Sequence, residues 1–169
     1  MKKVVSIVLA VLLIVLCFAG CKPAEEYVQQ PTLKYDTEYP ATAFEYNLTM
    51  NKKIVPMLNI LEGHISKAKD VCDGKYPIEY EIKSVEDDLK LVQDLFEETK
   101  RVYPPKDCSD RHSDILTQIN RVVNSLEVYL DTLKATTDLS NTAQQQDIID
   151  CAGVMESEFT GLKNMFNIS

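Results

Sequence analysis

CSDRHSDILTQINRVVNSLEVYLDTLK, residues 108–134, is the stretch that decides the fold class. Its apolar residues, with one histidine among them, recur at alternating steps of four and three. That spacing places them on one face of an α-helix, because about 3.6 residues complete a turn. We therefore predict a long helix that buries one stripe of side chains: Cys108, His112, Ile115, Ile119, Val122, Leu126, Tyr129 and Leu133.

The segment before this stretch, residues 77–103, repeats the pattern. Pro77 suits the first turn of a helix, where a backbone N–H has no helical partner, and Pro104 and Pro105 stop the helix. A short proline turn therefore joins two antiparallel helices. The stripe of this helix comprises Ile78, Ile82, Val85, Leu89, Val92, Phe96, Thr99 and Tyr103.

A third stripe follows in residues 142–166. Thr142 and Gln145 stand three residues apart, which is the spacing of a capping box, so we expect the last helix to begin at about residue 142. Its apolar side is formed by Ile148, Cys151, Met155, Phe159, Leu162 and Phe166.

The first segment, residues 44–72, has a helical face that a proline interrupts. Pro56 removes a helical hydrogen bond, and we expect it to kink or split the helix near Lys52. Gly74 has the position of a C-terminal cap. The expected face consists of Phe44, Leu48, Ile54, Leu58, Leu61, Ile65, Ala68 and Cys72.

The connections between these segments are short, which favours antiparallel neighbours. We predict an all-α domain over residues 42–169 with the architecture of an antiparallel up-down-up-down four-helix bundle. The alternative is a three-helix bundle with a loosely docked N-terminal helix. No segment shows the alternating pattern of a β-strand.

The first 20 residues have the three parts of a secretory signal peptide. Lys2 and Lys3 precede an apolar run over residues 4–18, and the small residues Ala19 and Gly20 follow. Counted to Gly20, the run measures about 25 Å as a helix, which is less than the ~30 Å hydrocarbon core of a membrane. Cleavage after residue 20 is therefore favoured, and an uncleaved N-terminal membrane helix is the alternative.

Ala19-Gly20-Cys21 resembles the lipobox of prokaryotic lipoproteins, although Phe18 stands where that pattern prefers Leu. The resemblance implies that Cys21 becomes the first mature residue and carries the lipid, while Cys17 leaves with the signal peptide. Such chains anchor a protein stably, because each buried methylene contributes about 0.8 kcal/mol.

Residues 21–41 read as a lipidated cysteine followed by a flexible tether, with three prolines and no glycine. Loss of Lys2 and Lys3 with the signal peptide would leave 16 Lys and Arg against 26 Asp and Glu, a formal charge of −10. An acidic chain attracts neither phosphate backbones nor anionic lipid head groups, so we expect no nucleic-acid partner and no peripheral binding of the domain to the membrane surface.

Cys108 and His112 are the candidate metal ligands, because residues four apart share a helix face and sulfur with imidazole suits zinc or copper. These two residues supply only half of a metal site. His64, Cys72 and Cys151 are expected at other heights along the bundle, so they cannot complete it. Core packing is therefore the preferred interpretation, and no cofactor is expected. An oxidising compartment permits disulfides, and Cys72 and Cys151 are the two cysteines expected closest in height along the bundle.

Five acidic residues cluster on the second helix, and their spacing puts most of them on its solvated face, opposite the apolar stripe. The chain has no glycine-containing calcium loop that would give them another role. They are Asp87, Asp88, Asp94, Glu97 and Glu98.

The sequence thus predicts a membrane-anchored lipoprotein with a non-enzymatic helical bundle. The bundle would bind an unknown envelope protein or ligand outside the cytoplasmic membrane. The alternative is a metal-binding or sensing bundle that uses Cys108 and His112. Residues 103–116, YPPKDCSDRHSDIL, resemble a helix start in uncharacterised helical-bundle lipoproteins; the resemblance supports the fold and implies no activity.

Overall fold

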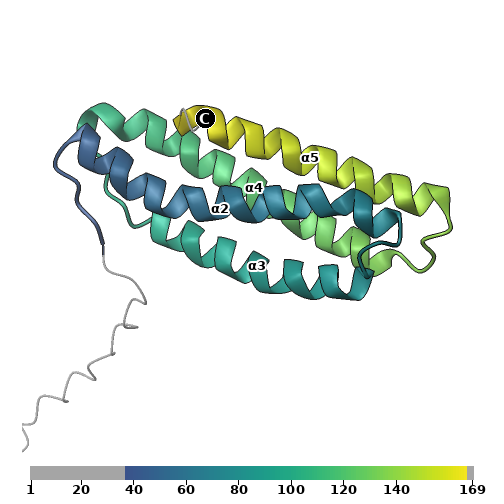
Figure 1. Cartoon of the computed structure of the whole chain (residues 1–169). Helices are drawn as coiled ribbons and strands as arrows, with labels where there is room; N and C mark the ends of the chain where they lie inside the picture. The colour runs from purple at the N-terminus through teal and green to yellow at the C-terminus, as the bar shows by residue number, and fades with distance from the viewer. Residues whose placement is uncertain (1–36, 167–169) are drawn as a thin grey trace, which may run out of the picture. The chain divides into compact units, whose positions relative to one another are not determined.

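The structure, a computed structural model, describes residues 37–166, and helices make up most of this range (Figure 1). In chain order they are α2 (Ala43–Cys72), α3 (Ile78–Thr99), the short 3-10 helix η1 (Lys106–Cys108), α4 (Ser109–Ala135) and α5 (Thr142–Phe166). None of the helices within the described range is long and apolar enough to cross a membrane. The predicted signal peptide, Cys21 and the tether up to residue 36 lie outside the described residues.

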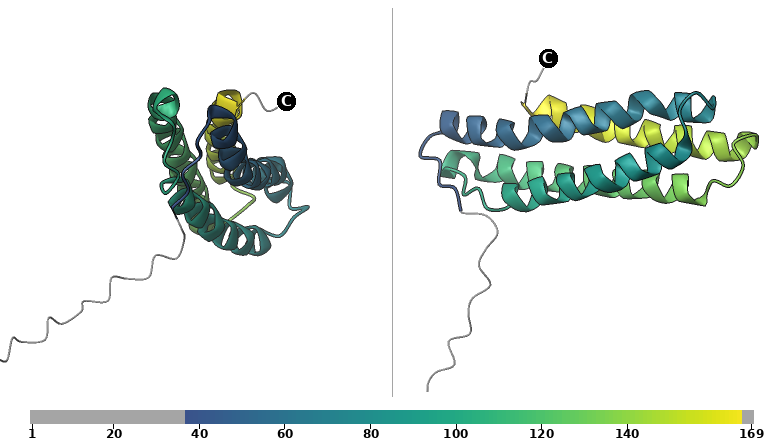
Figure 2. Two further views of the ribbon diagram at one scale, coloured as in Figure 1. Left: turned by 90° about the vertical axis from the view of Figure 1, so that its left-hand side faces the viewer. Right: turned by 60° about the horizontal axis from the view of Figure 1, so that its bottom comes forward.

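Successive long helices run antiparallel, so the prediction of an up-down-up-down four-helix bundle is confirmed (Figure 2). Helix α2 packs against α3 and α5, and α4 packs against the same two helices. The three-helix alternative is wrong, because α2 contributes a continuous buried face. We call the end where α2 and α4 begin the proximal end, and the opposite end, which contains Gly74, the distal end.

The core follows the stripe predicted for α4, every residue of which is buried. Residues Ile148, Met155 and Leu162 of α5 and Val85 and Val92 of α3 close the same core. Each large apolar side chain that leaves water stabilises the fold by about 1.5–3 kcal/mol. This burial, more than helix propensity, holds the four helices in place.

Helix α2 runs unbroken through Pro56, so the expected split is wrong. Proline removes one hydrogen bond, but the residues around it, Ile54, Met57 and Leu58, are buried against the other helices. Their packing holds both halves in one helix although a helical bond is missing.

The first two turns of α2 bury a different face from the predicted one. Phe44 and Leu48 are exposed, whereas Tyr46 and Met50 are fully buried. Tyr46, Met50 and Ile54 follow one another at steps of four and share the buried face, whereas the step of six from Leu48 to Ile54 leaves that face. The Tyr46 hydroxyl also lies 3.0 Å from Nδ1 of His112 on α4.

The helix ends at the distal side have well-defined caps. Gly74 adopts φ 69°, the left-handed conformation that glycine takes without strain, and closes α2 as predicted. At the start of α5 the capping box is wrong: Asn141 accepts the cap bond from the Ala143 N–H at 2.9 Å. The Gln145 side chain instead donates to the carbonyl of Cys72, which ties α5 to the end of α2.

A short extended segment from the predicted tether is docked at the proximal end. Helix α3 stops at Thr99, and the Glu38 backbone pairs with the residues that follow it. The Glu38 N–H donates to Arg101 O at 3.1 Å, and the Tyr103 N–H donates to Glu38 O at 2.8 Å. The Glu38 carboxylate also lies 2.7 Å from Nζ of Lys53 on α2. Contacts with the bundle therefore reach at least to Glu38, before the predicted boundary at residue 42.

Candidate functional site

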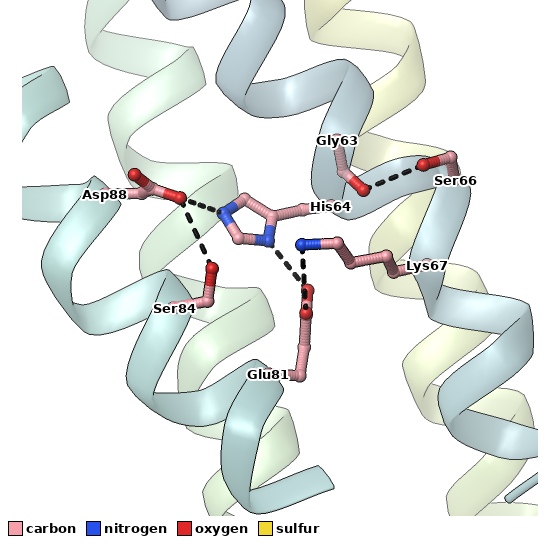
Figure 3. A network of polar contacts seen from close by, with 7 residues as sticks. All are labelled: Gly63, His64, Ser66, Lys67, Glu81, Ser84 and Asp88. Atoms are coloured by element: carbon pink, nitrogen blue, oxygen red, sulfur yellow. Dashed lines mark hydrogen bonds and ion pairs between the residues drawn. The ribbon is translucent and has the colours of Figure 1, made fainter. Parts of the chain in front are cut away.

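The most polar part of the core is a cluster between α2 and α3, which we call the His64 cluster (Figure 3). His64 Nδ1 lies 2.7 Å from Glu81 Oε1, and His64 Nε2 lies 3.0 Å from Asp88 Oδ2. Lys67 Nζ is 3.9 Å from Glu81 Oε2, and Ser84 Oγ is 3.5 Å from Asp88 Oδ2. The cluster therefore joins two residues of α2 to three of α3.

Hydrogen bonding fixes the number of protons in this cluster. A carboxylate only accepts, so two ionised carboxylates require both N–H donors of an imidazolium. A neutral His64 donates from one nitrogen, and its other contact then needs a protonated carboxyl group on Glu81 or Asp88. Either way, the cluster holds one proton more than a neutral histidine beside two carboxylates. With the Lys67 ammonium group its charges balance, which is what burial of ionised groups requires.

Tyr129 of α4 reaches the same region from the other side of the core. Burial and the nearby charge of Glu81 raise the pKa of the Tyr129 phenol. Its hydroxyl and Glu81 Oε2 are nevertheless both buried without a partner in hydrogen-bonding geometry. An unsatisfied buried polar group costs about 1–3 kcal/mol, so these two unpaired groups lower the stability of the core.

The position of the His64 cluster suits a structural role. The His64 side chain is 1% exposed and that of Glu81 is not exposed at all, so neither meets solvent. A general acid or base must come within hydrogen-bonding distance of the group whose proton it transfers. In this structure the two groups instead hold α2 against α3.

Sequence reasoning missed this cluster, although a signal for it exists. The sequence pattern predicts most of the acidic cluster that contains Asp88 on the solvated face, and it gives Glu81 no role. Yet Glu81, Val85, Asp88, Val92 and Thr99 also follow steps of three, four and seven along α3, and all of them except Asp88 are fully buried. In α2, His64 has apolar neighbours one helical turn away on each side, Leu61 and Ala68.

The candidate metal ligands Cys108 and His112 are both buried at the proximal end of α4. His112 Nδ1 is engaged by the Tyr46 hydroxyl, and burial lowers the pKa of His112. Burial likewise raises the pKa of Tyr46 to about 12. Among residues 37–166 no group of three or more His, Cys, Asp and Glu side chains is arranged to hold a metal ion.

The thiols of residues 37–166, those of Cys72, Cys108 and Cys151, are all free, so the Cys72–Cys151 disulfide is not formed. Cys72 Sγ lies 3.5 Å from the carbonyl oxygen of Gln145, and Cys151 Sγ lies 3.3 Å from Thr132 Oγ1. Burial raises the pKa of the Cys72 thiol, which disfavours the reactive thiolate.

An open cavity of about 360 Å³ lies between α4 and α5. Val128 and Val154, each more than half exposed, contribute to its apolar lining, and charge comes from Arg121, Asp150 and Glu158. A second cavity of about 420 Å³ shares Asp150 with the first and extends toward the distal end. We call the two together the α4–α5 groove; an open and partly apolar surface of this size can receive part of another molecule.

Charge is distributed unevenly along the bundle. The half nearer the proximal end, residues 37–56, 90–121 and 155–166, has nine Lys and Arg against ten Asp and Glu. The distal half, residues 57–89 and 122–154, has five against thirteen. Nearly all of the net negative charge of the described residues therefore lies on the distal half.

Comparison with known proteins gives no relative: no family, no curated protein and no solved structure matches this chain.

Proposed function

We propose that the chain is a lipid-anchored protein of the prokaryotic cell envelope whose helical bundle binds a partner outside the cytoplasmic membrane. The sequence Ala19-Gly20-Cys21 after a short apolar run supports the anchor. The role of the bundle is binding and not catalysis. The α4–α5 groove supports this, because it is open and the part that contains Val128 and Val154 is largely apolar, while His64 and Glu81 at the centre of the His64 cluster are closed to solvent.

The chemistry of the groove indicates the kind of partner. Exposed Val128 and Val154 offer apolar contacts, while Asp150 and Glu158 outnumber the single cation, Arg121. The distal half into which the groove extends is strongly acidic. An amphipathic segment of a partner protein with apolar side chains and flanking Lys or Arg would satisfy both features.

The anchor is tested by the mass of the mature protein. Cleavage before Cys21 and acylation would remove the first 20 residues and add acyl chains. Cys21→Ser should abolish both the modification and the membrane association. An unchanged membrane-bound product from Cys21→Ser would contradict the anchor and favour an uncleaved membrane helix.

The binding surface is tested with two labelled model peptides, an amphipathic helix of Leu and Lys and its Leu and Glu counterpart. Fluorescence anisotropy should show tighter binding of the Leu–Lys peptide. Val128→Asp and Val154→Asp should weaken it about tenfold, because they place a charge on the apolar lining. Leu91→Asp adds the same charge to exposed α3, away from the groove, and is the matched control. Equal affinities for the groove and control variants would refute the groove as the binding surface.

We do not propose the alternative of a metal-binding bundle, because within residues 37–166 Cys108 and His112 are not part of a group of three or more possible ligands, and His112 Nδ1 contacts the Tyr46 hydroxyl.

A further inference from the structure

The proximal end of the bundle carries a group of exposed aromatic side chains. Tyr39 is 73% exposed, Phe44 77% and Tyr103 61%. Tyr39 and Tyr103 stack on each other with ring centroids 5.2 Å apart. Only one other aromatic side chain among residues 37–166 is exposed to this degree, Tyr80 at the start of α3.

The backbone holds these aromatic rings in place. Glu38, next to Tyr39, exchanges backbone hydrogen bonds with the segment that contains Tyr103. The Glu38 carboxylate is anchored on Lys53, which also contacts Glu98 on α3 at 3.3 Å. The aromatic pair is therefore presented on a fixed surface, so little conformational entropy remains to be lost when a partner covers it.

We propose that this aromatic proximal end rests on the lipid surface in the anchored protein. Tyrosine rings concentrate at membrane–water interfaces, because the ring is apolar and the hydroxyl is polar. Three exposed aromatic residues at one end of a bundle match that environment. The inference rests on the proposed lipid anchor and adds which end of the domain faces the membrane.

The distribution of charge supports the same orientation. The proximal half is nearly neutral, with one more acidic than basic residue, whereas the distal half has eight more. A membrane surface that contains anionic lipids repels the distal half and leaves the proximal half almost unaffected. Orientation with the distal half outward also leaves the distal part of the α4–α5 groove directed away from the membrane.

The site where the tether joins the bundle supports it as well. The described chain begins at Thr37, and Glu38 is docked at the proximal end. Fifteen residues separate Cys21 from Thr37, so the two are at most about 58 Å apart when this stretch is fully extended. The proposed anchor therefore connects to the bundle through its proximal end.

The absence of tryptophan from the chain allows a direct test. Single variants Tyr103→Trp and Phe44→Trp place one indole at the proximal end, and Tyr80→Trp places one at the distal end. Tyr80 and Tyr103 are similarly exposed, at 65% and 61%, so they form a matched pair. The full lipidated chains are reconstituted in phosphatidylethanolamine–phosphatidylglycerol vesicles with or without doxyl-labelled phosphatidylcholine.

We expect doxyl lipid to quench the proximal indoles at least about twofold more than the distal indole, with a blue shift of their emission. Equal quenching at all three positions would overturn the inference, as would a proximal blue shift without quenching, which indicates contact between protein copies. Flotation of the same samples reports on the anchor separately. Vesicles that float the protein without proximal quenching refute only the orientation, whereas a protein that does not float refutes the anchor as well.

Discussion

His64 Nδ1 lies 2.7 Å from Glu81 Oε1, and solvent reaches neither side chain. The contact joins the second half of α2 to the first turn of α3, two helices that the loop around Gly74 connects. This contact is thus a polar clamp between two helices whose other buried residues are mostly apolar. Its energetic weight comes less from the attraction itself than from the cost of leaving either group buried and unpaired.

Removal of both partners should therefore cost less than the sum of the two single removals. We expect His64→Leu or Glu81→Leu alone to lower the free energy of unfolding by about 3–5 kcal/mol. The double variant should recover about 2 kcal/mol or more of the summed losses, because no uncompensated charge remains at its centre. Equilibrium urea unfolding followed by circular dichroism measures all three.

The control for this cycle is Asp87→Leu, since Asp87 is exposed on α3 beside Asp88. Its effect should stay within about 0.5 kcal/mol. Strictly additive losses in the double variant would show that His64 and Glu81 are not coupled.

Two buried tyrosines provide a second comparison, because the same substitution should have different effects at each. Tyr46→Phe removes the partner of His112 and should cost about 1–2 kcal/mol. Tyr129→Phe removes a hydroxyl that has no hydrogen-bond partner and should leave the free energy of unfolding unchanged or raise it. Both rings are fully buried, so the apolar contribution is matched.

The Tyr46 variant should also change the alkaline limb of the stability profile. The unfolded phenol ionises near its ordinary pKa of about 10, whereas the folded pKa is raised to about 12. Between these values the folded state holds more protons, so stability falls as the pH rises. Tyr46→Phe should flatten that fall in pH-dependent urea unfolding, and an unchanged slope would contradict the assignment.

The fold could be predicted from the sequence because its signals are long and repeated. The α4 stripe extends over seven turns, and no residue on it argues for another face. Burial of that stripe requires partner helices, which the flanking segments supply at short separations. The spacing of apolar residues along the chain was therefore enough to predict the architecture.

The polar core could not be predicted because its residues have meaning only in pairs. Helix α3 has two neighbouring rows of side chains, a half-buried one through Ile82 and Leu89 and a fully buried one through Val85 and Val92. Because the second row also contains Glu81 and Asp88, the sequence suggests that it faces solvent. Only the contacts with His64, which lies on another helix, explain why Glu81 and Asp88 face the core. The buried face of the first turns of α2, by contrast, follows from the sequence, because Tyr46, Met50 and Ile54 are spaced by four residues.

His112 itself should set the acidic limb of stability. Burial lowers the pKa of the folded imidazole below the unfolded value of about 6.5. Below about pH 6.5 the unfolded state therefore binds the proton first, so stability is full above this pH and falls as the pH decreases. His112→Gln does not titrate but can still accept from the Tyr46 hydroxyl. It should show a smaller fall between about pH 6.5 and 5 in urea unfolding; an identical fall would assign the limb to other groups.

The contact between α4 and α5 depends on a glycine, and a second glycine of α5 supplies the control. A Cβ atom at Gly161 would lie 2.7 Å from Nε2 of Gln118, whereas one at Gly153 would meet nothing within 4 Å. That Nε2 donates to the backbone carbonyl of Glu158 at 3.1 Å and to its carboxylate at 2.7 Å.

Both glycines lie inside a helix, where alanine is favoured by roughly 0.5–1 kcal/mol. Gly153→Ala should therefore raise the free energy of unfolding by about that amount. Gly161→Ala gains the same propensity but displaces Gln118 from two hydrogen bonds, each contributing about 0.5–3 kcal/mol, and should be less stable than Gly153→Ala by about 1–2 kcal/mol. Addition of Gln118→Ala should remove most of the effect of the Gly161 substitution in the same urea titration. Equal stabilisation by the two single variants would show that Gln118 moves aside at no cost.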